Sequence, residues 1–200
     1  MSIRSKVIII GWMITVPIFL SLITLLSGEE KMSDQDLKRY VQNRRSVVQQ
    51  LLSVVRRNIK SPSEATREII IMLGELRAEE AAEFLVDNIK VMPPGTFEKT
   101  TKIVYPAVGA LIHIGYPSVQ VILNKGFLRE RSDLEQKLMA HVIRSVLGQG
   151  YQNSWEVGTR LGRLIIQEHL CSAKPPAPVR ERLVKFMEKH FPTEKPIKRR

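Results

Sequence analysis

The sequence has almost no cysteine to cross-link the fold and little of the apolar and polar alternation that is typical of β-strands. Cys171 is the only cysteine among 200 residues, so no internal disulfide can form and apolar packing must hold the chain together. We expect this cysteine to be a small buried residue on the apolar side of a helix and not a reactive thiol. Alternation of apolar and polar residues with period two is almost absent, which excludes a mainly β fold.

The sequence also lacks the motifs that carry most enzyme chemistry. It contains no glycine-rich phosphate loop, HExxH helix, nucleophile elbow or paired metal-ligand cysteines. The glycines at 148 and 150 follow a helical pattern and are typical of a helix stop, while Glu79 and Glu80 stand where negative charge favours a helix start. We therefore predict no catalytic, cofactor-binding or metal-binding residue and no enzyme activity.

One long apolar run is present near the amino terminus. Residues Val7 to Ser27 carry no charge, and as a helix they would extend about 30 Å, the thickness of the hydrocarbon core of a bilayer. The run is longer than the apolar region of a signal peptide, and the best cleavage site, after Gly28, has Leu26 where a small residue is preferred. The pattern favours an uncleaved single-pass membrane anchor at residues 7–27. A cleaved signal peptide followed by secretion, and a buried soluble helix, are the alternatives.

The charges beside this run predict its orientation. Arg4 and Lys6 precede the run, whereas Glu29 and Glu30 follow it, which places the C-terminal part outside the cytoplasm under the positive-inside rule. Other basic residues soon after the run make the balance close: Lys31, Lys38 and Arg39. The expected location is the membrane, with an extracytoplasmic C-terminal domain.

The remaining residues have the spacing of helices bounded by caps. Apolar residues three and four apart predict an all-α chain. A first amphipathic helix follows a cap at Ser33, and its apolar stripe consists of Leu37, Val41, Val48, Leu51, Leu52, Val55 and Ile59. Ser61, Pro62 and Glu64 predict the start of the next helix. We divide the chain into an anchor (1–28), a linking helix (29–60), a helical domain (61–190) and a basic flexible tail (191–200).

Two helix pairs repeat at an offset of 38 residues. The first pair turns at Arg77 and Ala78, and its apolar positions match those of the second pair one for one. Ala65, Ile69, Ile70, Leu73 and Leu76 correspond to Ile103, Ala107, Val108, Leu111 and Ile114, and Ala81, Phe84, Leu85 and Ile89 correspond to Val119, Ile122, Leu123 and Phe127. A period near 40 built from helix, turn and helix predicts a short right-handed α-solenoid of stacked antiparallel helix pairs.

These segments resemble HEAT and armadillo-type repeats, most clearly over residues 61–127. The usual form of such a repeat is an apolar helix ending in Leu-Gly, a turn with small residues or proline, and a second apolar helix. The matching features here are Gly74, Gly115, Pro117, Ala81 and Ala82. The resemblance implies a helical-repeat protein.

A third helix pair is expected from a capping box at Ser132 and Glu135 and from a second cap at Asn153. The inward apolar positions are Leu134, Leu138, Val142, Val146 and Leu147 in its first helix, and Trp155, Leu161, Leu164, Ile165 and Leu170 in its second. A proline-rich link at 174–178 then precedes a final helix over about Val179–His190, with Leu183, Phe186 and Met187 inward.

Three histidines stand at equal intervals, but their spacing does not favour a metal site. His113, His141 and His169 are 28 residues apart, so in a repeat of about 38 residues they fall at different places in each helix pair. Some helical-repeat enzymes related to the HEAT family carry His-Glu dipeptides as iron ligands, whereas this chain has only the reverse order, at Glu168 and His169. We expect ordinary surface or interhelical histidines.

Positive charge is concentrated at the carboxyl end. The net charge is +11, and residues 174–200 contribute +6 of it from nine basic and three acidic side chains. The tail ends in Lys195, Lys198, Arg199 and Arg200, which either stay solvated or bind an acidic surface. Anionic lipid, acidic protein or polysaccharide suits an extracytoplasmic domain better than nucleic acid does.

Together these patterns predict a membrane-anchored, non-enzymatic scaffold that binds an unidentified protein partner at the membrane, without a cofactor. One alternative is an enzyme or accessory subunit that holds a small molecule near Tyr151 and Trp155. Another is nucleic-acid binding by a cytoplasmic domain through the basic helices around Arg44, Arg45, Arg56 and Arg57.

The anchor is tested by sequencing the mature amino terminus and by fusing a topology reporter after Arg200. We expect an intact amino terminus, because the site after Gly28 is poor, and a reporter that is active only outside the cytoplasm. A new amino terminus at Glu29 would instead identify a cleaved signal peptide, and a cytoplasmic reporter would reverse the orientation.

Overall fold

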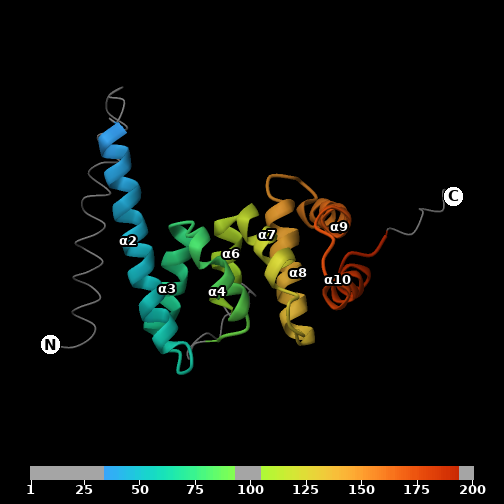
Figure 1. Cartoon of the computed structure of the whole chain (residues 1–200), viewed down its shortest axis with the longest axis horizontal. Helices are drawn as coiled ribbons and strands as arrows, with labels where there is room; N and C mark the ends of the chain where they lie inside the picture. The colour runs from blue at the N-terminus through green and yellow to red at the C-terminus, as the bar shows by residue number, and fades with distance from the viewer. Residues whose placement is uncertain (1–33, 93–104, 194–200) are drawn as a thin grey trace. The chain divides into compact units, whose positions relative to one another are not determined.

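The computed structural model describes residues 34–92 and 105–193, and every regular element within these ranges is helical (Figure 1). The all-α prediction is confirmed for this part of the chain. The chain divides into two compact units, Met1–Arg44 and Arg45–Arg200. The predicted anchor at 7–27, the predicted cap at Ser33, the inward residue Ile103 and the end of the tail from 194 onward lie outside the described residues.

The described residues form eight α-helices and one short 3-10 helix. They are α2 (Asp34–Asn58), α3 (Glu64–Glu75), the 3-10 helix η1 (Glu79–Ala81), α4 (Ala82–Asp87), α6 (Pro106–Ile114), α7 (Tyr116–Lys125), α8 (Asp133–Leu147), α9 (Ser154–Ser172) and α10 (Ala177–His190). The third pair and the final helix were therefore predicted in the right places.

Two capping boxes begin helices, and one of them differs from the prediction. The expected cap at Ser61 is wrong, because α3 begins at Glu64 after an N-cap at Ser63. The Ser63 amide donates to Thr66 Oγ1 at 3.1 Å, and the Thr66 amide donates to Ser63 Oγ at 3.4 Å. This reciprocal pair satisfies the first-turn donors two residues later than expected. The box of Ser132 and Glu135 at the start of α8 is confirmed.

The turns between helices follow the sequence signals. Arg77 has φ +46, and the next residue, Ala78, is buried and donates its amide to the Leu73 carbonyl at 3.0 Å. Gly115 joins α6 to α7 with φ +84, a left-handed conformation that glycine adopts without a steric penalty. Gly148 is the C-cap of α8, which confirms the predicted helix stop.

Buried apolar side chains form one cluster from Val48 in α2 to Phe191 after α10. Most predicted inward positions belong to this cluster or pack against it. Five are wrong, because they are exposed: Val41, Ala65, Leu134, Trp155 and Leu164. Ala65 and Leu134 lie in the first turns of their helices, where little chain packs against them.

Small residues bring two pairs of helices into close contact. In α3, a Cβ on Gly74 would lie 2.6 Å from the Ala110 Cα of α6. In α9, a Cβ on Gly158 would lie 2.2 Å from the carbonyl oxygen of Arg144 in α8, and Gly162 faces the ring of Phe191. The face of α9 that contains the glycines therefore packs inward.

This packing explains two errors on α9. Leu164 and Cys171 lie on the side of the helix opposite Gly158 and Gly162, and both are exposed. The prediction of a buried Cys171 is therefore wrong. The apolar pattern of α9 does not predict this orientation, because the closest contacts of the helix are made by Gly158 and Gly162, which have no side chain.

Among the described residues, no single helix has both the length and the apolar composition needed to cross a bilayer. The pair Pro106–Ile114 and Tyr116–Lys125 meets the same criteria when its two helices are joined, although they are bent by 114° relative to each other.

The close packing at Gly74 is tested by Gly74→Leu in the full-length chain. We expect the free energy of unfolding to fall by about 3 kcal/mol and the Tm by roughly 10 °C, because the new side chain must displace the backbone of α6. Ala65→Leu adds the same side chain at an exposed position of α3 and should leave the Tm nearly unchanged. Equal melting temperatures for the two variants, measured by circular dichroism, would contradict this packing.

Candidate functional site

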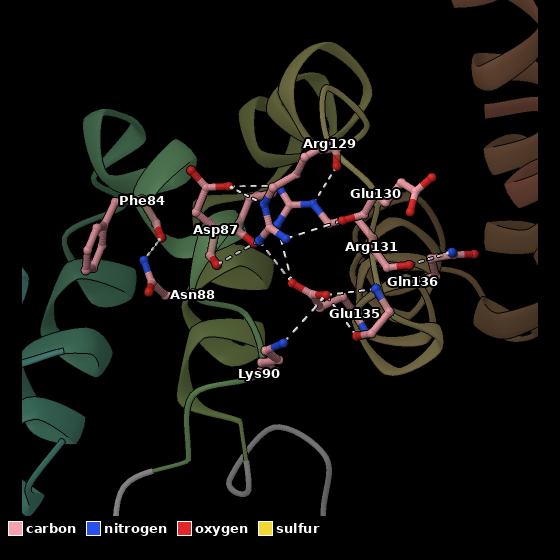
Figure 2. A network of polar contacts seen from close by, with 12 residues as sticks. Phe84, Asp87, Asn88, Lys90, Arg129, Glu130, Arg131, Glu135 and Gln136 are labelled. Atoms are coloured by element: carbon pink, nitrogen blue, oxygen red, sulfur yellow. Dashed lines mark hydrogen bonds and ion pairs between the residues drawn. The ribbon is translucent and has the colours of Figure 1, made fainter. Parts of the chain in front are cut away.

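A cluster of charged side chains, here called the Arg131 network, lies where three helices end or begin (Figure 2). Asp87 is the last residue of α4, and Arg129 and Arg131 lie in the connection between α7 and α8. Glu135 is in the first turn of α8, and Lys90 follows α4. The network thus joins residues that are more than 40 positions apart.

The Arg131 guanidinium is the centre of the network. Its side chain is 1% exposed, and its Nη2 donates to Asp87 Oδ1 at 2.7 Å. Its Nε donates to the Gly126 carbonyl at 2.6 Å, and its Nη1 lies 3.5 Å from Glu135 Oε1. One side chain therefore connects the end of α4, the end of α7 and the start of α8.

Glu135 completes the network as a buried carboxylate with several donors. Its side chain is 2% exposed. Oε2 accepts the Ser132 amide at 2.9 Å and the Ser132 hydroxyl at 2.8 Å, and Oε1 accepts Arg129 Nη2 at 3.1 Å. Burial alone would raise the pKa of Glu135, but the hydrogen bonds from Ser132 and the charge of Arg129 lower it to about 2.

This geometry gives the Arg131 network a structural role. A carboxylate held ionised by four nearby donors is a poor proton acceptor at neutral pH, so Glu135 is unsuited to general base catalysis. The sequence revealed only the Ser132–Glu135 capping box. Neither Asp87 nor Arg131 carried a local signal, because their partners come from other helices.

A second group of residues, here called the aromatic ledge, consists of Trp155 with the side chains behind it and of Tyr151, four positions earlier in the sequence. The Arg144 guanidinium lies 4.6 Å from the ring centroid of Trp155 and 4.9 Å from that of Phe191. Arg144 Nε donates to Thr159 Oγ1 at 3.1 Å, and its Nη2 donates to the His190 carbonyl. The cation is thus held between two rings.

The front of the aromatic ledge is open to solvent. Trp155 is 53% exposed and Tyr151 is 56% exposed. The His141 ring centroid lies 5.7 Å from that of Trp155. Trp155, expected in the core, is instead an exposed ring that stacks on Arg144, because a cation held over an aromatic face is favourable even at the surface.

The histidines and the paired glutamates that were considered in the sequence lie at separate places in the fold. His113 is exposed on α6, His141 is half-buried on α8, and His169 is half-buried on α9, where burial lowers its pKa. Within residues 34–92 and 105–193, no group of three or more histidine, cysteine, aspartate or glutamate side chains is arranged to hold a metal ion. Glu79 and Glu80 open η1, as predicted.

The Arg131 network predicts a pH-dependent stability that Glu135→Gln removes. The pKa of Glu135 is about 2 in the folded chain, against 4.5 for an unperturbed glutamate. The ionised carboxylate therefore stabilises the fold fully above pH 4.5, and this stabilisation is lost as the pH falls toward 2. At neutral pH the free energy of unfolding of the variant should be about 3 kcal/mol lower than that of the wild-type chain, and the difference should vanish at acid pH. Glu156→Gln breaks an exposed pair with Arg160 and should cost less than about 0.5 kcal/mol. Denaturant titration over this pH range measures both.

Comparison with known proteins gives no further assignment. No protein-family model, no curated protein and no solved structure matches this chain at a significant level.

Proposed function

We propose that the chain is a membrane-anchored, non-enzymatic scaffold that holds another protein at the membrane, outside the cytoplasm. Its helical domain is a short right-handed solenoid of HEAT-like helix pairs, and the aromatic ledge is the surface that contacts the partner. The observation that carries this proposal is the exposure of Tyr151 and Trp155, together with the packing of Trp155 on Arg144.

The composition of the aromatic ledge favours a protein partner. Tryptophan, tyrosine and arginine are the side chains that most often dominate the binding energy of protein interfaces. Trp155 is already held by its stack on Arg144, so little side-chain entropy is lost when a partner covers the ring. Its helix is packed closely at Gly158 against the backbone of Arg144 in α8 and at Gly162 against the Phe191 ring.

The contacts between helices support a stacked arrangement. Helix α3 packs on α6, α4 packs on α7, and α6 packs on α8, as neighbouring repeats of a solenoid do. The Phe186 ring of α10 lies 4.7 Å from the ring of Phe127, and Arg182 donates to the Leu128 carbonyl. The final helix therefore packs against the segment that follows α7.

The proposal is tested by capture from membranes. Full-length tagged chain is crosslinked in native membranes, solubilised in detergent and purified, and the captured proteins are identified by mass spectrometry. We expect a specific partner whose recovery falls by at least about tenfold in the double variant Tyr151→Ala, Trp155→Ala, because aromatic anchors commonly contribute 2 kcal/mol or more.

Leu164→Ala is the matched control, because Leu164 is an exposed apolar residue on the opposite side of α9. It should leave capture unchanged. The melting temperature of each variant is measured in parallel, so that unfolding is separated from loss of contact. No partner after crosslinking, or equal capture by the wild-type chain and the double variant, would overturn the proposal.

A further inference from the structure

We propose that the first turns of α2 lie on an anionic bilayer surface as a basic amphipathic helix, beside the membrane anchor. This inference rests on the anchor of the proposed function. It concerns a different surface from the aromatic ledge, and the ligand is lipid headgroup and not protein.

The apolar stripe of α2 starts exposed and ends buried. Val41, Val48 and Val55 are spaced by seven residues, so they share one side of this 25-residue helix. Val48 and Val55 are fully buried in the domain core. Val41 is 53% exposed, and its neighbour Tyr40 is 49% exposed. The first half of the helix thus exposes, at Val41, a position that is buried one and two heptads later, and it carries Arg44 and Arg45 where the second half has Leu51 and Leu52.

Basic side chains outnumber acidic ones along α2, by four to two in residues 34–45. Residues 37–63 contain seven basic and no acidic side chains. Asp34 and Asp36 come before them, at the helix start, where negative charge favours the free amides. Lys38 and Arg45 are exposed one turn before and one turn after Val41. An amphipathic helix with apolar residues between basic ones is the pattern that binds at the boundary of headgroups and acyl chains.

Tyr40 also suits the surface of a bilayer. A tyrosine ring has an apolar body and a polar tip, and such side chains concentrate at the level of the lipid headgroups. Long basic side chains can place their stems along apolar surface while the charge reaches phosphate. Tyr40, Lys38 and Arg45 are therefore suited to the bilayer interface, whereas an apolar protein core would leave the charges of Lys38 and Arg45 unpaired.

Chain connectivity brings this helix to a bilayer. Only residues 28–33 separate the end of the apolar run at Ser27 from the start of α2 at Asp34. Six residues reach at most about 20 Å, even when fully extended. If residues 7–27 cross a membrane, the start of α2 lies within that distance of its surface, where lipid is the most concentrated apolar and anionic partner. Protein partners have no such fixed position.

The test uses the full-length chain in vesicles of phosphatidylcholine alone and of phosphatidylcholine mixed with phosphatidylglycerol in equal parts. Cys171 is replaced by serine, and an environment-sensitive fluorophore is attached to a single cysteine at Val41. A second protein carries it at Gln49, which is exposed on the polar side of α2. We expect a blue shift at position 41 in the anionic vesicles, with quenching by spin-labelled lipid, and no change at position 49.

Charge reversal then tests the role of the cations. Lys38→Glu with Arg45→Glu should abolish the blue shift at position 41, because each cation contributes about a fivefold gain in affinity for an anionic surface. Arg57→Glu with Lys60→Glu changes the net charge equally, farther along the chain, and should retain the shift. Melting temperatures identify any variant that fails to fold.

Three results would overturn the proposal. The first is an unchanged spectrum at position 41 in both kinds of vesicle. The second is an equal shift in phosphatidylcholine alone, which would exclude recognition of lipid charge. The third is a blue shift without quenching by spin-labelled lipid, which would mean that protein covers Val41. Resistance of the chain to alkaline extraction is measured in the same vesicles, so a failed anchor is distinguished from a failed surface helix.

Discussion

The buried guanidinium of Arg131 fixes how three successive segments of this domain meet. Removing a charge from water is costly unless hydrogen bonds and opposite charge offset the loss. Here Asp87 comes from the end of α4, the Gly126 carbonyl from the end of α7, and Glu135 from the start of α8. A shift of any of these helix ends would leave a charge without its partner. Because a misplaced register is penalised so strongly, the network specifies one arrangement of the helices more than it adds net stability.

Close backbone contact is the second constraint on the arrangement. Gly74 lies against Ala110, and Gly158 lies against the backbone of Arg144, so these helices approach without side chains between them. Dispersion forces favour such proximity because many atom pairs then lie near their optimal separation. The glycines on α9 also orient that helix, and the aromatic ledge is a result, since Trp155 stands at its start beside the stacked Arg144.

The sequence predicted the helices well because their signals are local. Capping boxes, proline positions and the period of apolar residues require only neighbours along the chain, and they identified the Ser132 cap, the Arg77 turn and the final helix. The orientation of α9 was not predicted, because it depends on glycines facing another helix. The partners of Arg131 were equally hidden, since Asp87 is 44 positions away. Signals between neighbouring residues therefore predict the helices, whereas contacts between residues far apart in the sequence decide which side chains meet.

The brevity of the central helices has a consequence for how the chain folds. Helix α4 has 6 residues, α6 has 9 and α7 has 10, whereas isolated helices shorter than about 12–15 residues are marginal in water. None of the three can persist before it packs on its neighbours. The middle of the domain therefore forms collectively, as α4, α6 and α7 pack on one another and on α8.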